Sequence, residues 1–323
     1  QRKIIMAQIT NTYSQYDAKG EREDLSDIIY SISPTDTPFM SNIGKNKATA
    51  VYHEWQTDAL AAAASNNHQI EGDEVAFNAM VATTRVGNRT QISRKSVIVS
   101  GTLESVSKAG RNNEMAYQIS KASKELKRDM ETTLLLNQAP VTGSDTAARK
   151  LAGIETWIEA NTNHASAGSP TPADPTGDGT DVRVVGTQRA FTEAQLKDVV
   201  AKCWESGGDP SMIMLGSFNK QKLSGFTGGS TRFDPAENKR LVASVDIYES
   251  DFGALTAVPN RFMQARSAYV LQPDMWAVAY LRDFQLQDLA QSGDAEKKFL
   301  LAEYTLESRN QAASGGIFDL TTS

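Results

Sequence analysis

The sequence predicts an α+β fold in which one long helix lies against a sheet whose strands are distant in the chain. One amphipathic segment between Asn112 and Pro140 has no helical neighbour in sequence. A shorter capped helix at 192–206 is followed by an apolar strand, and strand-like segments dominate after residue 241. A lone amphipathic helix has to bury its apolar face on another element, and a sheet is the element that this sequence offers.

Composition narrows the class of protein. Of the 323 residues 40% are hydrophobic and 22% are charged, which is typical of a globular chain and excludes disordered, collagenous and integral membrane proteins. The net charge of −6 argues against a surface that binds nucleic acid throughout, and leaves room only for a local basic patch. The single cysteine, Cys203, excludes an intrachain disulfide and a cysteine-based metal cage, and suits a reducing compartment.

The N-terminal segment, residues 1–45, is polar and rich in turn residues. It lacks the apolar core of a secretion signal, and because it starts with Gln1 we expect a few residues to be missing or removed. Only Asp24–Ser31 has helical apolar spacing, and the prolines of Ser33–Met40 predict an extended, kinked path. An arm without its own core is expected to lie on another surface.

A long hairpin is predicted for residues 46–95. Strand patterns occur at 48–55 and 75–84, where Val75, Phe77, Ala79 and Val81 alternate on one face, and 96–100 brings the chain back. The segment between the two strands ends in a turn at Glu71–Asp73. Such a hairpin is only marginally stable in water by itself, so we expect it to find a partner on another surface.

The strongest helix of the sequence begins after Asn112 or Asn113 as its cap and ends before Pro140. Four basic residues lie elsewhere on its surface: Lys121, Lys124, Lys127 and Arg128. We expect it to be a spine packed against a sheet through apolar residues at helical spacing: Met115, Ile119, Ala122, Leu126 and Met130.

A compact α/β unit follows a long polar loop at 161–190. Thr192 and Gln195 form a capping box, and the helix that they start ends at Gly207-Gly208 and leads to a buried strand, Met212–Leu215. Its apolar stripe consists of Leu196, Val199, Val200 and Cys203. After a flexible loop at 225–236 we expect strands at 242–248, 269–271, 275–281, 284–286 and 299–308.

The sequence contains no recognisable catalytic or cofactor motif. No phosphate-binding loop, dinucleotide fingerprint or nucleophile elbow occurs, and His53, His68 and His164 show no metal-ligand spacing. Asp174–Gly179 faintly resembles a calcium loop, but Val185 stands where the bidentate glutamate belongs, so a solvated turn is favoured. Cys203 is expected to be a small buried apolar residue. We therefore predict no catalytic residue, no metal site and no cofactor.

Charge is distributed unevenly along the chain. Residues 48–84 contain five acids and no base, whereas 85–128 contain ten bases and three acids. The two blocks are either solvated surfaces or complementary surfaces of neighbouring molecules. In the second case the acids of the hairpin tip are Glu71, Asp73 and Glu74, and their partners are Arg85, Lys121, Lys124 and Arg128.

Four segments carry a resemblance to a known family. They are Leu25–Tyr30 with Ser33–Phe39, Arg94–Ser96, the helix 116–136 that leads into Asn137, and Met212–Gly216. Together with the order of elements over most of 20–310, they make the chain similar to tailed-bacteriophage major capsid proteins of the Hong Kong 97 fold. Within that fold, the amino-acid sequence most resembles the podophage capsid family formerly of unknown function.

The resemblance implies four parts: an N-terminal arm (1–45), an E-loop (46–95), a P-domain (96–150 with 263–323) and an A-domain (151–262). It implies a structural protein that assembles with itself into hexamers and pentamers of an icosahedral shell, formed in the bacterial cytoplasm and present in the virion. The shell would enclose double-stranded DNA without sequence-specific binding and without a membrane. A scaffolding protein, a portal and a cement protein are the candidate further partners.

Two other functions compete with this one. Encapsulin-like bacterial compartments share the fold, although the proline-rich arm favours a virus, and a soluble enzyme of unrecognised type could use carboxylates of 151–262. One departure from capsid relatives that cross-link is that no lysine lies between Lys47 and Lys95. We therefore expect a shell without covalent links.

Overall fold

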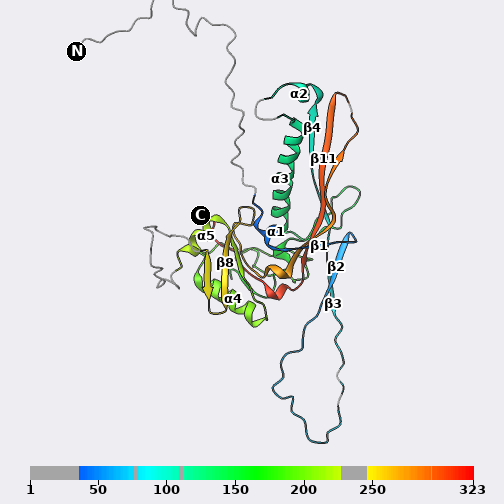
Figure 1. Cartoon of the computed structure of the whole chain (residues 1–323). Coiled ribbons are helices and arrows are strands. Elements are labelled where there is room, and N and C mark those ends of the chain that lie inside the picture. The colour runs from blue at the N-terminus through cyan, green and yellow to red at the C-terminus, as the bar shows by residue number, and fades with distance from the viewer. Residues whose placement is uncertain (1–35, 76, 78, 109–111, 227–245, 292) are drawn as a thin grey trace, which may run out of the picture.

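The computed structural model describes residues 36–75, 77, 79–108, 112–226, 246–291 and 293–323. Figure 1 shows an elongated molecule, with a long helix and sheet at one end, a compact α/β unit beside its other end, and a loop that projects away from both. The helix expected at 24–31 and most of the loop at 225–236 lie outside the described residues.

The elongated part is a four-stranded sheet in the order β1-β10-β11-β4. Its strands are β1 (Gly44–Lys47), β10 (Trp276–Asp288), β11 (Ala295–Ser308) and β4 (Gln91–Ser100). β1 runs parallel to β10, and the other pairs are antiparallel. The two strands expected at 275–281 and 284–286 form one continuous strand, β10. Its pairing with β11 shifts in register between Tyr280 and Gln285, and this irregularity bends the strand without ending it.

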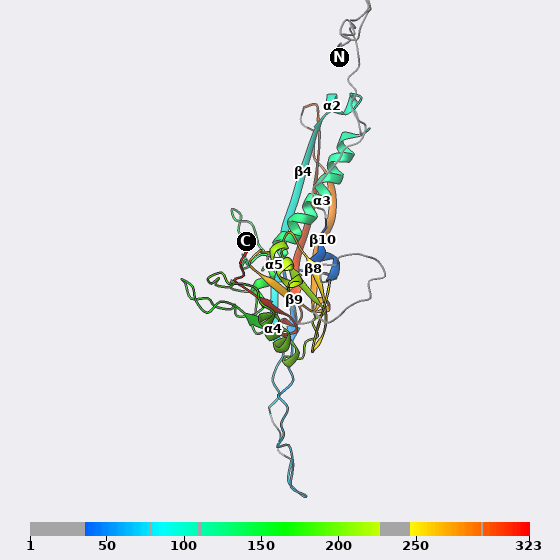
Figure 2. The same cartoon turned by 90° about the vertical axis from the view of Figure 1, so that its left-hand side faces the viewer.

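Helix α3 (Glu114–Leu134) lies along β4 and β11 (Figures 1 and 2). Asn113 is its N-cap, since its side-chain oxygen accepts the backbone N–H of Ala116 at 2.6 Å. Its inward stripe comprises the buried Met115, Ala122, Leu126 and Met130 and the partly buried Ile119. A short helix, α2 (Gly101–Ser105), joins β4 to the segment before α3.

The compact unit is a six-stranded sheet in the order β5-β12-β9-β6-β8-β7. Its strands are β5 (Thr162–Asn163), β12 (Gly315–Ile317), β9 (Ala268–Leu271), β6 (Met212–Leu215), β8 (Gly253–Pro259) and β7 (Ile247–Ser250). Two helices, α4 (Glu193–Glu205) and α5 (Ser217–Ser224), belong to this unit, and both parts of the predicted capping box of α4 are present. The described residues also form three short 3₁₀ helices: Ile154–Thr156, Pro273–Met275 and Gln311–Ala313.

Strand β6 joins the two parts into one body, because both of its faces are buried. Ile213 and Leu215 pack with the apolar stripe of α4. Met212 and Met214 point to the opposite face and pack in the core that contains Leu126 of α3. The alternation of side chains along a strand therefore lets four consecutive apolar residues serve two cores.

Several sequence-based expectations were wrong. The described residues of 58–83 form no strand, and β2 (Tyr52–Thr57) pairs only with β3 (Thr84–Arg89). Alternation favours a strand only where one face is covered, and Val75, Phe77 and Val81 are 72%, 93% and 90% exposed. Pro38 does not exclude a helix but begins one, α1 (Pro38–Asn42), because the first helical position needs no N–H donor.

The packing of α3 generates a stability prediction. Leu126→Ala should lower the free energy of unfolding of the unassembled subunit by about 2–5 kcal/mol, since a fully buried side chain is replaced by a cavity. Urea unfolding followed by circular dichroism measures the change. Ser120→Ala, on the exposed side of the same helix, should change the value by at most about 0.5 kcal/mol. Equal unfolding midpoints for the two variants would contradict this account of the core.

Candidate assembly interface

The most exposed part of the described chain is the segment 58–83, here called the projecting loop. It leaves the body at the β2–β3 hairpin, whose register runs from Tyr52 opposite Arg89 to Thr57 opposite Thr84. Figure 1 shows the loop extending beyond this hairpin on the side away from α3.

The base of the hairpin is fastened to β11 through the carboxylate of Glu307. Its Oε2 lies 3.3 Å from His53 Nε2 and accepts a hydrogen bond from Asn46 Nδ2 at 2.8 Å, while Oε1 accepts one from Arg309 Nε at 3.1 Å. Burial alone would raise the pKa of Glu307, but the hydrogen bonds from Asn46, Arg309 and His53 outweigh it and lower the pKa. Strand β2 is thus held to the end of β11 by the carboxylate of Glu307.

Strand β3 is held to the body by the buried amide of Asn88. Its Nδ2 donates to the carbonyl oxygens of Leu306 at 2.8 Å and Ala152 at 3.1 Å, and its Oδ1 accepts the N–H of Ala152 at 2.8 Å. On β2, the ring of Trp55 lies 5.3 Å from that of Trp157. The base of the hairpin is therefore rigidly attached, and only the loop beyond it stands away from the body.

The three predicted acids lie together at the tip of the projecting loop. The N–H of Asp73 donates to the carbonyl of Ile70 at 3.1 Å, and Gly72 has φ +84°, so the chain reverses within four residues. Glu71, Asp73 and Glu74 are all exposed. The tip is a compact acidic turn next to apolar side chains.

The four predicted basic partners do not form one cluster. Lys121 and Lys124 are exposed on α3, whereas Arg128 is half-buried with its guanidinium 5.9 Å from the ring centre of Phe262. Arg85 lies on the hairpin and forms two hydrogen bonds with Glu54, at 2.8 and 2.5 Å. Within one chain, α3 and the acidic tip lie at opposite ends of the molecule (Figure 1), so any contact between them joins two copies.

A buried carboxylate that sequence reasoning missed joins three parts of the body. Glu131 of α3 accepts the N–H groups of Phe39 at 2.7 Å and Met40 at 2.9 Å, and the Nδ2 of Asn260 at 2.7 Å. Burial raises the pKa of Glu131, although these hydrogen bonds act against it. No sequence signal distinguishes this glutamate, because a charged residue in a helix usually faces solvent.

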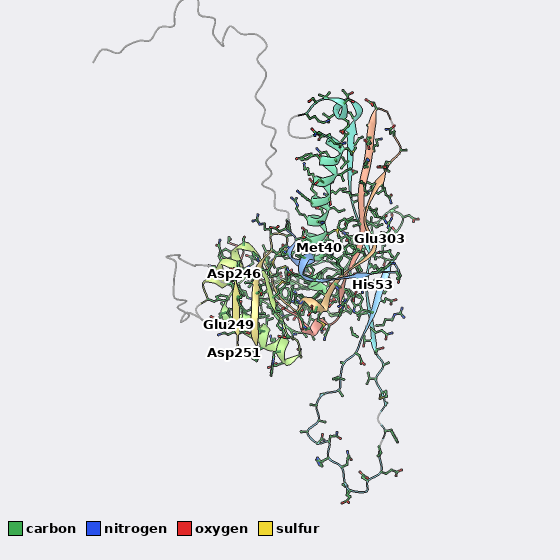
Figure 3. All side chains as sticks on the ribbon, in the orientation of Figure 1. Met40, His53, Asp246, Glu249, Asp251 and Glu303 are labelled. Atoms are coloured by element: carbon green, nitrogen blue, oxygen red, sulfur yellow. The ribbon has the colours of Figure 1, made fainter. Side chains whose placement is uncertain are left out.

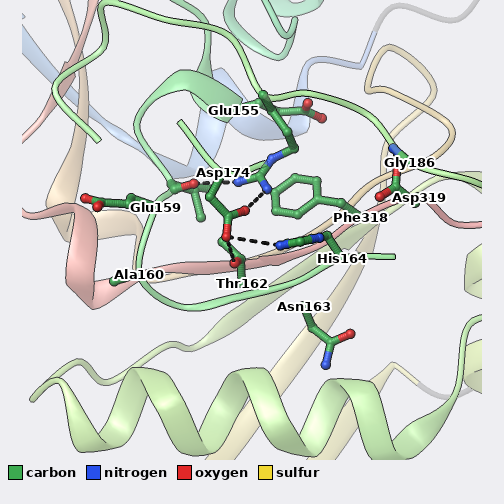
Figure 4. A network of polar contacts seen from close by, with 12 residues as sticks. Glu155, Glu159, Ala160, Thr162, Asn163, His164, Asp174, Gly186, Phe318 and Asp319 are labelled. Atoms are coloured by element: carbon green, nitrogen blue, oxygen red, sulfur yellow. Dashed lines mark hydrogen bonds and ion pairs between the residues drawn. The ribbon is translucent and has the colours of Figure 1, made fainter. Parts of the chain in front are cut away.

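The segment that resembled a calcium loop holds a structural ion pair instead (Figure 4). The buried guanidinium of Arg183 lies 3.5 Å from the ring centre of Phe318 and donates to Asp174 and to the carbonyl of Ile158. Asp174 also accepts from Thr162 Oγ1 at 2.7 Å and lies 3.4 Å from His164 Nε2. The oxygens of Asp174 therefore already have protein partners.

The described residues contain no recognisable reactive centre. Cys203 is buried, and burial raises the pKa of its thiol to about 12, which leaves it protonated and unreactive at neutral pH. Within this part of the chain, no group of three or more His, Cys, Asp or Glu side chains is arranged so that it could hold a metal ion. In the same part, no helix is both long and apolar enough to cross a bilayer.

Comparison with known proteins decides the family. The sequence model of the family described as SU10 major capsid protein matches residues 8–321 of this chain. The chain belongs to this family of major capsid proteins. The major capsid protein of Escherichia phage Phieco32 is 30% identical over 338 aligned positions, which cover 95% of this chain and 96% of the relative.

Solved structures show that this capsid protein has the Hong Kong 97 fold. The chain in the Cyanophage A-1(L) capsid asymmetric unit matches with a TM-score of 0.66 at 11% identity, covering 96% of this chain and 99% of that one. A chain from the capsid of a native GTA particle matches with a TM-score of 0.60 at 11% identity, covering 95% and 97%. The predicted fold class is confirmed.

The family assignment selects among the functions that the sequence left open. The protein is a structural major capsid protein of a tailed phage, located in the shell of the virion, and not an enzyme. The compartment shell and the soluble enzyme are therefore set aside.

The hydrogen bonds that Glu131 accepts from Phe39, Met40 and Asn260, here called the Glu131 clamp, generate a prediction for the stability of the protein and its pH dependence. Glu131→Gln should lower the free energy of unfolding at pH 7 by about 1–3 kcal/mol, because an amide nitrogen cannot accept the N–H groups that the carboxylate accepts. Since the pKa of Glu131 is raised in the folded state, its contribution is largest near its ordinary value of 4.5 and declines as the pH rises through the folded value.

Urea unfolding of both proteins at about pH 5 and about pH 7 measures this dependence. The difference between wild type and E131Q should be larger at the lower pH. Glu125→Gln, the same exchange on the outer side of α3, should change the free energy of unfolding by at most about 0.5 kcal/mol. A difference between wild type and E131Q that grows with rising pH would contradict the raised pKa.

Proposed function

We propose that this capsid protein assembles into the hexamers and pentamers of an icosahedral head that encloses double-stranded DNA. In this proposal residues 1–45 are the arm, 46–95 the E-loop, 96–150 with 263–323 the P-domain, and 151–262 the A-domain. The observation that carries the proposal is the projecting loop, an exposed apolar and acidic segment on a rigidly attached base.

The apolar side chains of the projecting loop support a contact between copies. Six of them are between 72% and 100% exposed: Leu60, Ile70, Val75, Phe77, Met80 and Val81. Soluble proteins rarely leave so much apolar surface uncovered unless another surface covers it. A neighbouring subunit of the shell supplies such a surface at every position.

The charges support a specific direction for this contact. Glu71, Asp73 and Glu74 of one copy would meet a basic surface of its neighbour, for which Lys121, Lys124 and Arg128 are the partners on α3 that the sequence suggests. Arg85 is the weakest of the four predicted partners, since Glu54 already neutralises it. Each exposed pair contributes at most about 1 kcal/mol, but every subunit repeats the contact.

The proposed relation to DNA is enclosure, without sequence-specific contacts. A subunit with a net charge of −6 gains little from counterion release, so contacts with DNA would be local. A scaffolding protein, a portal and a cement protein remain the candidate further partners.

Microscopy tests the proposed assembly. The purified protein should form rings or closed shells in negative stain and sediment as large particles, because each subunit exposes a self-complementary surface. Size-exclusion chromatography separates such particles from unassembled chains. A single small oligomer that does not grow with concentration, low salt or crowding would contradict the proposal.

The lysine distribution predicts a shell without covalent links. An isopeptide bond at the projecting loop needs a lysine amine there, and none lies between Lys47 and Lys95. Particles boiled in detergent should give one band near 35.1 kDa on a denaturing gel. A ladder of subunit multiples that survives reduction would overturn this prediction.

A further inference from the structure

We propose that the tip of the projecting loop, Ile70–Val75, inserts into a pocket of about 810 Å³ on a second copy of this chain. The pocket lies where α1, β1, β10 and α3 meet. This inference rests on the proposed assembly and names the receiving site for the loop.

The pocket combines positive charge with an aromatic wall. Lys45, Lys47 and Lys127 line it together with Met40, Tyr280 and Phe284. The rings of Tyr280 and Phe284 are 6.2 Å apart, and Lys127 Nζ lies 5.9 Å from the ring centre of Phe284. A ligand that suits this lining carries negative charge next to aliphatic side chains.

The three lysines are exposed and carry charge that the described part of the chain does not neutralise. Within that part no carboxylate lies within ion-pair distance of Lys45, Lys47 or Lys127. The lining contains one acid, Asp283, so the pocket has an excess of two positive charges. A cleft with lysines on a low-dielectric aromatic wall concentrates its field on an incoming anion.

The tip of the projecting loop has the complementary chemistry. Its turn presents Glu71, Asp73 and Glu74, and the flanking Ile70 and Val75 are 80% and 72% exposed. Three acids thus face three lysines, and two aliphatic side chains are available for Tyr280 and Phe284. In the rest of the projecting loop, the segment between Asp58 and Glu71 contains no acid.

The occupant has to come from another copy. Figure 3 shows Met40, which lines the pocket, in the middle of the body, while the projecting loop extends away from it beyond His53. An extended chain rises about 3.3 Å per residue, so each half of 58–83 reaches on the order of 40 Å from its base. That reach is directed outward, away from the pocket of the same chain (Figure 3).

The pocket is a better receptor than the exposed face of α3. Lys121 and Lys124 lie on a convex helix surface, and Lys121 is already 4.0 Å from Glu125. That face offers charge without an apolar wall, whereas the pocket offers both. Electrostatic steering then selects the site, and burial of Ile70 and Val75 supplies the larger share of the free energy.

Cysteine cross-linking tests the site in assembled particles of the full chain. Asp73→Cys at the tip is combined with Ser41→Cys at the pocket, or with Ser120→Cys on the exposed face of α3 as the matched control. The native Cys203 is buried and does not interfere. After treatment with a short bismaleimide, D73C/S41C should give a ladder of subunit multiples on a denaturing gel, and D73C/S120C should give the monomer band.

The outcomes separate this inference from the proposed function. Particles that form but cross-link only in D73C/S120C would place the tip on α3 and overturn the pocket. Particles of D73C/S41C that show no ladder would also overturn it, and a cross-link from S41C to a cysteine within residues 1–35 would then assign the pocket to the arm. Failure of the unmodified chain to form particles would instead contradict the proposed assembly.

Charge exchange provides an independent test. E71K/D73K/E74K and K45E/K47E/K127E should each fold, as judged by circular dichroism, but lose particle formation, because like charges then face each other. Combining the six substitutions should restore particles. Restoration by K121E/K124E, and not by K45E/K47E/K127E, would overturn the proposed pocket.

Discussion

The buried carboxylate of Glu131 is the contact on which the arrangement of the body depends. A charge removed from water needs strong partners, and this one has three: two N–H groups from the start of α1 and the amide of Asn260 after β8. Through it, α3 holds both helix α1 and the end of strand β8 in the six-stranded sheet. The first turn of α1 also offers its unpaired N–H groups to a negative charge, which favours this geometry.

Around this clamp, two apolar cores share one strand. β6 presents Met212 and Met214 to the core beneath α3, and Ile213 and Leu215 to the core beneath α4. A relative movement of the two parts would expose one of these pairs, so the body behaves as a single unit. The hairpin base belongs to this unit through Glu307 and Asn88. The projecting loop therefore begins and ends at a hairpin base that is fixed on the body.

This division between a rigid body and an extended loop suits a protein that repeats its contacts throughout a shell. The body keeps the pocket, the spine helix and the hairpin base in constant relative positions. The loop carries apolar and acidic groups that a single chain leaves exposed. In the proposed assembly these groups are covered by many weak, identical contacts, whose sum is large because each subunit contributes them.

The sequence by itself determined the elements whose signals are local. A cap at Asn112 or Asn113, the stripe that contains Leu126, the capping box at Thr192 and the apolar strand Met212–Leu215 follow from spacing and hydrogen-bonding chemistry within a few residues, and the structure selects Asn113 as the cap. The acidic tip was also visible, since its three acids lie within the four residues Glu71–Glu74. Only the tertiary structure decided the hydrogen bonds of Glu131, the grouping of the pocket lysines and the lack of strand pairing in the described residues of 75–83, because each depends on residues far apart in the chain. Lys45 and Lys127 meet only after α3 has packed on the sheet, and Val75 and Phe77 are exposed and have no partner strand within the described chain.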